Sequence, residues 1–223
     1  MEKQQGGFKA FVFDLDGTIL DTLPDLVLLT NAVMEARGYP THTTEEVLSY
    51  VGSGVRVLLQ RALPAGIDDR EIDDIQQQWM DMYPSYGHKM TKPYPQVEEV
   101  LKELRRRGCK LGVLSNKFDA AAREVVEHHF PSMFDIVRGE GPDTPRKPNP
   151  TGLRKMCADM GVSPADTVFV GDSGGTDMAV AVACGAFPLG VTWGYQSVDV
   201  LLEYGARALI DAPIDLLQYA PED

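Results

Sequence analysis

The sequence predicts an α/β protein with a parallel-sheet, Rossmann-like core into which an all-helical segment is inserted. In the C-terminal half, short apolar strands alternate with amphipathic helices, an order typical of a parallel sheet covered on both faces. Residues 21–91, in contrast, show helical periodicity and no convincing strand. We therefore expect a discontinuous core of residues 1–20 and 92–223 and a helical cap domain of residues 21–91.

The first predicted strand, residues 8–13, is apolar and aromatic and runs into Asp14-Leu15-Asp16-Gly17-Thr18. A buried strand that ends in a glycine turn places both carboxylates at its carboxyl end, where open α/β sheets bind ligands. Two carboxylates so close together resist joint ionisation unless a cation lies between them or one keeps its proton. This stretch therefore indicates metal-assisted acid–base chemistry.

Four helices are predicted in the inserted segment. The first starts after Thr22, with Asp25 placed three residues later as in a capping box. The second starts near Thr43, and the third and fourth have apolar residues at helical spacing. Pro84 and Gly87 are expected to end the helical region.

The second and third of these helices are separated by Gly52-Ser53-Gly54. This flexible break could face the core and contact the leaving group of a substrate, or it could be a simple connection between helices. Arg56 and Arg61 could meet a substrate carboxylate, but solvated helix arginines are an equally good interpretation.

Polar groups follow the later strands of the core, beyond a stiff linker of residues 92–95. Ser115 and Asn116 follow a strand of residues 110–114, Lys147 precedes a helix, and Asp172 and Asp177 follow a strand of residues 167–170. Because the carboxyl ends of parallel strands meet at one edge, we expect these groups to converge on the first strand's two aspartates. The remaining strands are predicted at residues 135–137, 187–191 and 208–210.

The net charge of −12 and a pI near 4.7 argue against nucleic acid or an anionic membrane as the main partner. The attraction of an anionic substrate must then be local, from a metal ion or a few cations. No stretch reaches the roughly 18 consecutive apolar residues of a membrane span, and the polar residues 1–7 lack the apolar region of a secretion signal. These features indicate a cytoplasmic protein, and nothing in the sequence indicates an oligomeric state.

The cysteines and histidines are not arranged as a metal site. Cys109, Cys157 and Cys184 are far apart, which favours buried, reduced thiols over a disulfide framework or a zinc site. His128 and His129 end a predicted helix with no third ligand nearby in the sequence, so we do not expect them to bind a metal.

The order and spacing of these motifs resemble the haloacid dehalogenase superfamily of phosphotransferases. The four motifs of that superfamily correspond to the Asp14–Thr18 stretch, Ser115, Lys147 and the Gly171–Asp177 segment. Within it, the chain is most similar to phosphoglycolate phosphatases with a helical cap. That likeness rests on residues 16–25, 50–54, 92–95, 147–150 and 191–195. The chain departs from the pattern in having four residues between its last two motif aspartates, where related members often have three, and in Gln96, which replaces a common glycine.

The resemblance implies Mg²⁺-dependent hydrolysis of a small phosphate monoester, such as 2-phosphoglycolate, through an aspartyl-phosphate. Asp14 would be the nucleophile, and Asp16 would protonate the leaving alkoxide and then activate water. Mg²⁺ would be held by Asp14, the main-chain carbonyl of Asp16 and Asp172. The substrate would be a small phosphorylated metabolite.

The same resemblance gives roles to the other motif residues. Ser115 and the amide of Asn116, with help from Thr18, would bind phosphate oxygens. Lys147 would offset the charge on the nucleophile and the transferring group, and Asp177 would orient the metal shell or this lysine. Cap residues, among them the Gly52-Ser53-Gly54 break, would contact the leaving group.

Two other functions fit many of the same residues. A phosphosugar mutase uses the same core groups but protects the aspartyl-phosphate from water. A phospho-accepting signalling module also combines acidic groups, a hydroxyl and a lysine around a parallel sheet, but here a helical segment interrupts the core. Dehalogenase chemistry is disfavoured because it needs no acid at the position of Asp16.

Overall fold

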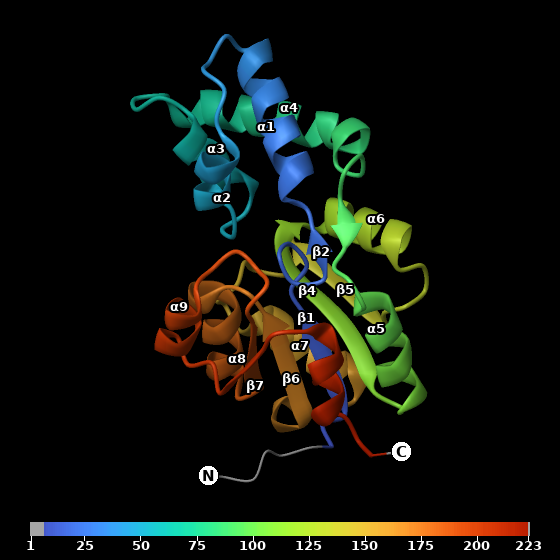
Figure 1. Ribbon diagram of the computed structural model, residues 1–223. Coiled ribbons are helices and arrows are strands. Elements are labelled where there is room, and N and C mark those ends of the chain that lie inside the picture. The colour runs from blue at the N-terminus through green and yellow to red at the C-terminus, as the bar shows by residue number, and fades with distance from the viewer. Residues whose placement is uncertain (1–6, 223) are drawn as a thin grey trace.

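In the computed structural model, which describes residues 7–222, one six-stranded sheet forms the centre of the molecule (Figure 1). Every pairing in this sheet is parallel, which confirms the predicted α/β fold class. Residues 1–6, most of the polar segment discussed as lacking a secretion signal, lie outside the described residues. The strands in their order across the sheet are β5 (Ile136–Glu140), β4 (Lys110–Phe118), β1 (Ala10–Phe13), β6 (Thr167–Gly171), β7 (Phe187–Val191) and β8 (Ala208–Ile210).

Helices cover both faces of the sheet, and strand β1 shows how the two faces are filled. Phe11 and Phe13 pack with α5 and α6 in one hydrophobic cluster, whereas Ala10 and Val12 pack with α7 and α8 in another. All four side chains are buried, so this strand is a continuous apolar run, as expected for the middle of a parallel sheet. The helices are α5 (Val97–Arg106), α6 (Asp119–His129), α7 (Thr151–Met160), α8 (Ala179–Cys184) and α9 (Val198–Glu203).

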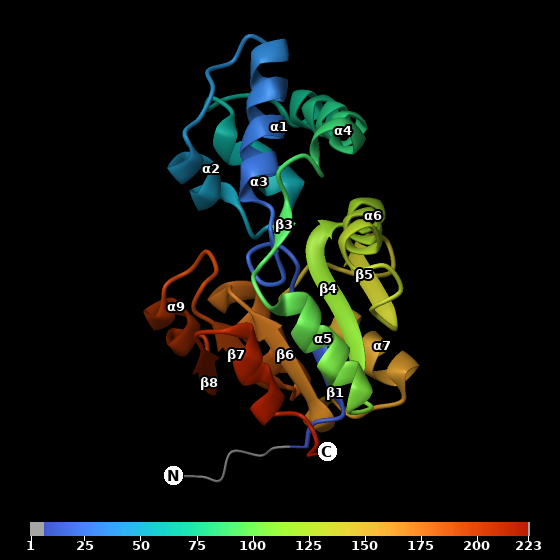
Figure 2. The same ribbon diagram turned by 45° about the vertical axis from the view of Figure 1, so that its right-hand side comes forward.

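The segment of residues 21–91, which we call the helical insert, lies beyond the carboxyl edge of the sheet (Figures 1 and 2). It has a hydrophobic cluster of its own, which includes Trp79 of its last helix and is joined by Ala121 of α6. None of the described helices is long and apolar enough to cross a membrane. The helices of the insert are α1 (Leu23–Ala36), α2 (Thr44–Tyr50), α3 (Val55–Ala62) and α4 (Asp69–Tyr86).

The chain enters and leaves the insert through two short strands that pair with each other. Strand β2 (Leu20–Asp21) is antiparallel to β3 (Lys92–Pro93). Above this pair, the buried carboxylate of Asp25 accepts hydrogen bonds from the backbone N–H of Met90 at 3.0 Å and from the backbone N–H and hydroxyl of Thr91, both at 2.7 Å. Asp25 thus ties the first helix of the insert to the returning chain.

Helix α1 begins as predicted, with Thr22 at its N-cap position and Asp25 in its first turn, but these two side chains do not form the capping hydrogen bonds. The side chain of Thr22 makes no cap hydrogen bond, and Asp25 contacts the returning chain. Instead, the phenol oxygen of Tyr195 accepts from the backbone N–H groups of Thr22 and Leu23, at 3.3 and 3.1 Å. The start of α1 is therefore capped by a core residue distant in sequence, which a local pattern does not reveal. The capping box of α2 at Thr43, in contrast, is present.

Three further expectations need correction. Strand β4 does not end at Leu114 but continues past a register shift to pair Phe118 with β5, because the polar residues between them are buried and bonded. Helix α4 runs through Pro84 to Tyr86 and ends at Gly87, so of the two residues expected to end it only the glycine does so. Cys184 is partly exposed, whereas the other two cysteines are buried as expected.

Candidate active site

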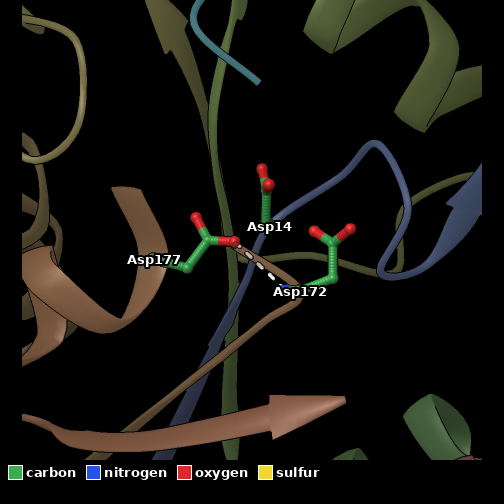
Figure 3. A group of neighbouring side chains, drawn as sticks. All are labelled: Asp14, Asp172 and Asp177. Atoms are coloured by element: carbon green, nitrogen blue, oxygen red, sulfur yellow. Dashed lines mark hydrogen bonds between the residues drawn. The ribbon is translucent and has the colours of Figure 1, made fainter. Parts of the chain in front are cut away.

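Three carboxylates from distant parts of the chain meet at the carboxyl edge of the sheet (Figure 3). Asp14 follows β1, Asp172 follows β6, and Asp177 lies in the π-helical turn Gly174–Met178. One oxygen from each lies within 4.8 Å of the others, and all three residues are buried. The parallel sheet thus brings together residues that are 158 or more positions apart from Asp14, as the strand-end argument predicts.

Lys147 lies between two of these carboxylates. Its Nζ is 2.8 Å from Oδ1 of Asp14 and 2.7 Å from Oδ1 of Asp177. Burial alone would lower the pKa of this ammonium group, but the two facing carboxylates hold its pKa above the ordinary value. Lys147 therefore stays charged and can offset negative charge next to Asp14.

Both carboxylate oxygens of Asp177 are used within the protein. Oδ1 accepts a hydrogen bond from Lys147, and Oδ2 accepts from the backbone N–H groups of Asp172 and Ser173, at 3.1 and 3.0 Å. A Cβ on Gly171 would lie 2.4 Å from that second oxygen, so the close approach requires glycine. Asp177 thereby holds both Lys147 and the loop that starts at Asp172. The sequence analysis expected it to orient this lysine or the metal shell.

Asp14 and Asp172 are the carboxylates best placed to hold a metal ion. Burial, with the charge of Asp177, raises the pKa of Asp172 to about 7 and raises the pKa of Asp14 well above its usual range. Oδ1 of Asp14 is buried and, apart from its ion pair with Lys147, has no hydrogen-bond partner in the described part of the chain. Buried carboxylate groups that repel one another fit a hard divalent cation such as Mg²⁺.

The remaining contacts of Asp172 fix its orientation. Its Oδ2 accepts from the backbone N–H of Tyr195 at 2.7 Å, and its Oδ1 accepts from the hydroxyl of Thr18 at 3.3 Å. Thr18 is not among the residues that line the cavity next to Asp14, so the structure places its hydroxyl on a carboxylate rather than beside a phosphate position. The side chain of Asp16 is outside the three-carboxylate group.

Asp16 is paired with a lysine that the sequence analysis did not single out. The Nζ of Lys117 lies 3.2 Å from Oδ1 of Asp16 and 5.1 Å from the ring centroid of Tyr83 in α4. The side chain of Lys117 is only 5% exposed. Burial by itself would lower the pKa of Lys117, but Asp16 and Tyr83 hold it above the ordinary value. A signal was available, because Lys117 directly follows the predicted pair Ser115-Asn116.

Lys117 changes the charge balance of the site. With all four carboxyl groups ionised (Asp14, Asp16, Asp172 and Asp177), two ammonium groups leave a formal net charge of −2. One Mg²⁺ would bring this sum to zero. If Lys117 were absent, the four carboxylates would outweigh Lys147 and Mg²⁺ together by one negative charge.

The side chain of Asn116 connects three segments around the site. Its amide Nδ2 donates to the carbonyl oxygens of Gly52 and Lys147, at 3.0 and 3.2 Å, and its Oδ1 accepts from the backbone N–H of Lys147 at 2.7 Å. The neighbouring Ser115 hydroxyl, which also lines the cavity, accepts from the backbone N–H of Lys117 at 3.1 Å. Asn116 therefore joins the insert to the loop that carries the catalytic candidate Lys147.

A cavity lies between the core and the helical insert, directly over Asp14. Its core side carries Asp14, Asp16, Ser115, Asn116, Lys117 and Asp172. Its insert side carries Leu26, Val51, Gly52, Gly54, Val55, Leu58 and Trp79. Two of the three residues in the predicted glycine break thus line the cavity, whereas Ser53 lines an adjoining outer groove together with Arg61.

Gly54 has a structural reason to be glycine. Its φ is +79°, and a Cβ there would lie 2.9 Å from Oε2 of Glu140 and 3.2 Å from the guanidinium of Arg146. These two core side chains form an ion pair at 2.7 Å. The absence of a side chain at Gly54 lets the insert approach the core at this point.

The chain matches known proteins over nearly its whole length. The model of the haloacid dehalogenase-like hydrolases matches residues 11–191. A phosphoglycolate phosphatase of Vibrio parahaemolyticus is 32% identical over 223 residues, which cover 96% of each chain. An N-acetylmuramic acid 6-phosphate phosphatase of Pseudomonas aeruginosa is 28% identical over 211 residues, which cover 94% of this chain and 93% of the other.

Solved structures share the fold. The crystal structure of a predicted phosphoglycolate phosphatase from Haemophilus somnus 129PT matches with a TM-score of 0.85 and 28% identity, covering 94% of this chain and 96% of that one. These matches confirm the resemblance expected from the motifs and the prediction that the protein is a hydrolytic enzyme. The chain belongs to the haloacid dehalogenase-like hydrolase family.

Proposed function

We propose that the protein hydrolyses a small phosphate monoester in a Mg²⁺-dependent reaction that passes through a phosphoryl group on Asp14. The observation that carries the proposal is the meeting of Asp14 with Asp172 and Lys147 in one buried group, with Lys147 Nζ 2.8 Å from Asp14. The names of the relatives make 2-phosphoglycolate the first ester to assay. The helical insert would act as a cap domain, with the boundaries expected from the sequence, and the enzyme would work in the cytoplasm.

In the first step, a carboxylate oxygen of Asp14 attacks phosphorus, and the bond from phosphorus to the ester oxygen breaks. Asp16 gives its proton to the departing oxygen, so the organic group leaves as an alcohol. Lys147 lies against Asp14 and offsets the charge that gathers around the transferring group.

In the second step, a water molecule attacks phosphorus and gives a proton to Asp16, and the bond from phosphorus to Asp14 breaks to release inorganic phosphate. Asp16 is thereby protonated again and ready for the next substrate. Ser115 and the backbone amide of Asn116 line the cavity beside Asp14 and would bind phosphate oxygens.

Asp14, Asp172 and the main-chain carbonyl of Asp16 would hold Mg²⁺, which when bound supplies positive charge next to the phosphoryl oxygens. Asp177 and Thr18 would act indirectly. Asp177 holds Lys147, and Thr18 holds Asp172.

Phosphate release from 2-phosphoglycolate and p-nitrophenyl phosphate tests the proposal. We expect release in Mg²⁺ to stop in excess EDTA and to return when Mg²⁺ is added back, because removing the metal takes two positive charges away from the carboxylates that would face a phosphate dianion. Release that continues unchanged in EDTA would contradict the metal requirement. A hexose 1-phosphate in the same assay distinguishes the mutase alternative, which would yield an isomer instead of free phosphate.

A further inference from the structure

We propose that the organic group of the substrate is uncharged and mainly apolar, an alkyl or aryl body rather than a carboxylate such as that of 2-phosphoglycolate. The inference rests on the proposed function, since it concerns the leaving group of the same phosphatase site. It follows from the part of the cavity that lies over Asp14 on the side of the helical insert.

Apolar side chains form that part of the cavity. Leu26 comes from α1, Val55 and Leu58 come from α3, and Trp79 comes from α4. Phe118, at the end of β4, continues the same surface on the core side. With the phosphate held beside Asp14, the organic group of an ester would lie among these side chains and remove their surface from water.

The insert offers no charge to this space. Among the described residues of the insert that line the cavity, none is charged. Arg56 is paired with Asp69 and Asp73. Arg61 donates to the backbone carbonyl of Ser49 at 3.3 Å and lines the outer groove instead. Neither of the two arginines considered as carboxylate partners lines the cavity.

Lys117 is the single cation among the described residues lining the cavity, and it is already engaged. Its Nζ pairs with Asp16 at 3.2 Å and lies over the ring of Tyr83. A carboxylate on the organic group would have to compete with Asp16 for this ammonium group while losing its own hydration among apolar side chains. An uncharged group has neither cost.

A homologous series of esters tests the inference with the intact enzyme in Mg²⁺. Ethyl, propyl, butyl and pentyl phosphates have leaving alcohols of nearly equal acidity, so differences in kcat/KM report binding of the chain. The transfer free energy of a buried methylene predicts a rise of about four-fold in kcat/KM per added carbon until the space is filled. The organic group of isobutyl phosphate is uncharged and resembles that of 2-phosphoglycolate in size and shape. Its kcat/KM should be at least about ten-fold higher than that of 2-phosphoglycolate.

Variants locate the effect in the insert. Val55→Thr keeps the size of the side chain but replaces a methyl group by a hydroxyl, and it should reduce the rise in kcat/KM per added carbon. Val198→Thr, at an exposed position of α9, is the matched control and should not change the series.

The outcomes separate this inference from the proposed function. Phosphate release that does not depend on chain length, or that is faster with 2-phosphoglycolate than with isobutyl phosphate, overturns the inference and leaves the phosphatase proposal standing. An equal effect of the two valine variants also overturns it. No release from any ester, including p-nitrophenyl phosphate, overturns both.

Discussion

The two sides of the cavity differ in how they are built. On the core side, charged groups near strand ends are held in pairs and hydrogen bonds, such as Lys117 with Asp16. On the insert side, the lining is apolar and belongs to helices with their own hydrophobic cluster. The difference suggests a division of labour in which the core supplies the chemistry and the insert selects the organic group.

The largest effect is expected on the core side. Asp14→Asn removes the proposed nucleophile and should lower kcat by about 10⁴-fold or more, by analogy with the loss of other covalent nucleophiles. Asp143→Asn, in an exposed loop, is the matched control and should keep wild-type turnover. Steady-state phosphate release measures both. An Asp14→Asn enzyme with near-normal turnover would remove the basis of the division.

A smaller effect is expected at Lys117, a positioning residue between the two sides. Lys117→Met should lower kcat for an alkyl phosphate about 10²-fold, because Asp16 loses the partner that orients it for proton transfer. The loss should be only about ten-fold with p-nitrophenyl phosphate, whose leaving group needs little protonation.

Lys102→Met, which removes an exposed surface ion pair, is the control for Lys117 and should have no effect. Equal losses with the two esters would mean that Lys117 acts on something other than the proton transfer of Asp16.

A further effect concerns the contact between the two sides. Gly54→Ala places a Cβ against the Glu140–Arg146 pair and should lower kcat/KM several-fold, about ten-fold at most, through a higher KM. Gly38→Ala also imposes a positive φ, +74°, but meets nothing within 4 Å. Thermal denaturation should show a loss of about 1 kcal/mol in both variants. The same KM in both variants would indicate that the close approach of Gly54 to the Glu140–Arg146 pair does not affect substrate binding.

The smallest effect concerns three histidines outside the cavity. The ring of His88, next to the return from the insert, stacks on His128 of α6 with ring centroids 5.2 Å apart, and His129 is adjacent at 4.8 Å from His128. Burial, with the charges of its two neighbours, lowers the pKa of His129 below 6.5. The unfolded chain then binds the proton more readily, so stability is lost as the pH falls below about 6.5.

His129→Gln tests this expectation. The melting temperature of the wild type should fall more between pH 7.5 and pH 5.5 than that of the variant, because the variant has no proton to take up at this position. Parallel melting curves for the two proteins would contradict the expected role of His129.

The sequence predicted the positions of site residues that lie directly beside a recognisable strand or helix pattern. Asp14, Asp172 and Lys147 could be expected to meet because each directly follows an apolar strand or precedes a helix start, and a parallel sheet gathers such positions. The four helices of the insert could be predicted because their apolar residues recur at helical spacing.

Other parts of the site depend on contacts across large separations. The phenol of Tyr195 caps α1 from 172 positions away, and His88 completes the group of histidines from another segment. The sequence alone does not distinguish Lys117 from an ordinary surface lysine. Its burial depends on the continuation of strand β4 past Leu114. The identity of the insert residues that line the cavity depends on how four helices pack, which periodicity alone does not determine.

The most direct test of the central claim is to stop a single turnover with acid and locate the phosphoryl group on the protein by peptide mass spectrometry. With p-nitrophenyl phosphate, whose leaving group needs little protonation, we expect one phosphoryl group on the peptide that contains Asp14, lost on treatment with hydroxylamine and more abundant in Asp16→Asn, where transfer to water is slowed. Phosphate release that proceeds with no phosphoryl group on Asp14, or with the group on another residue, would contradict it.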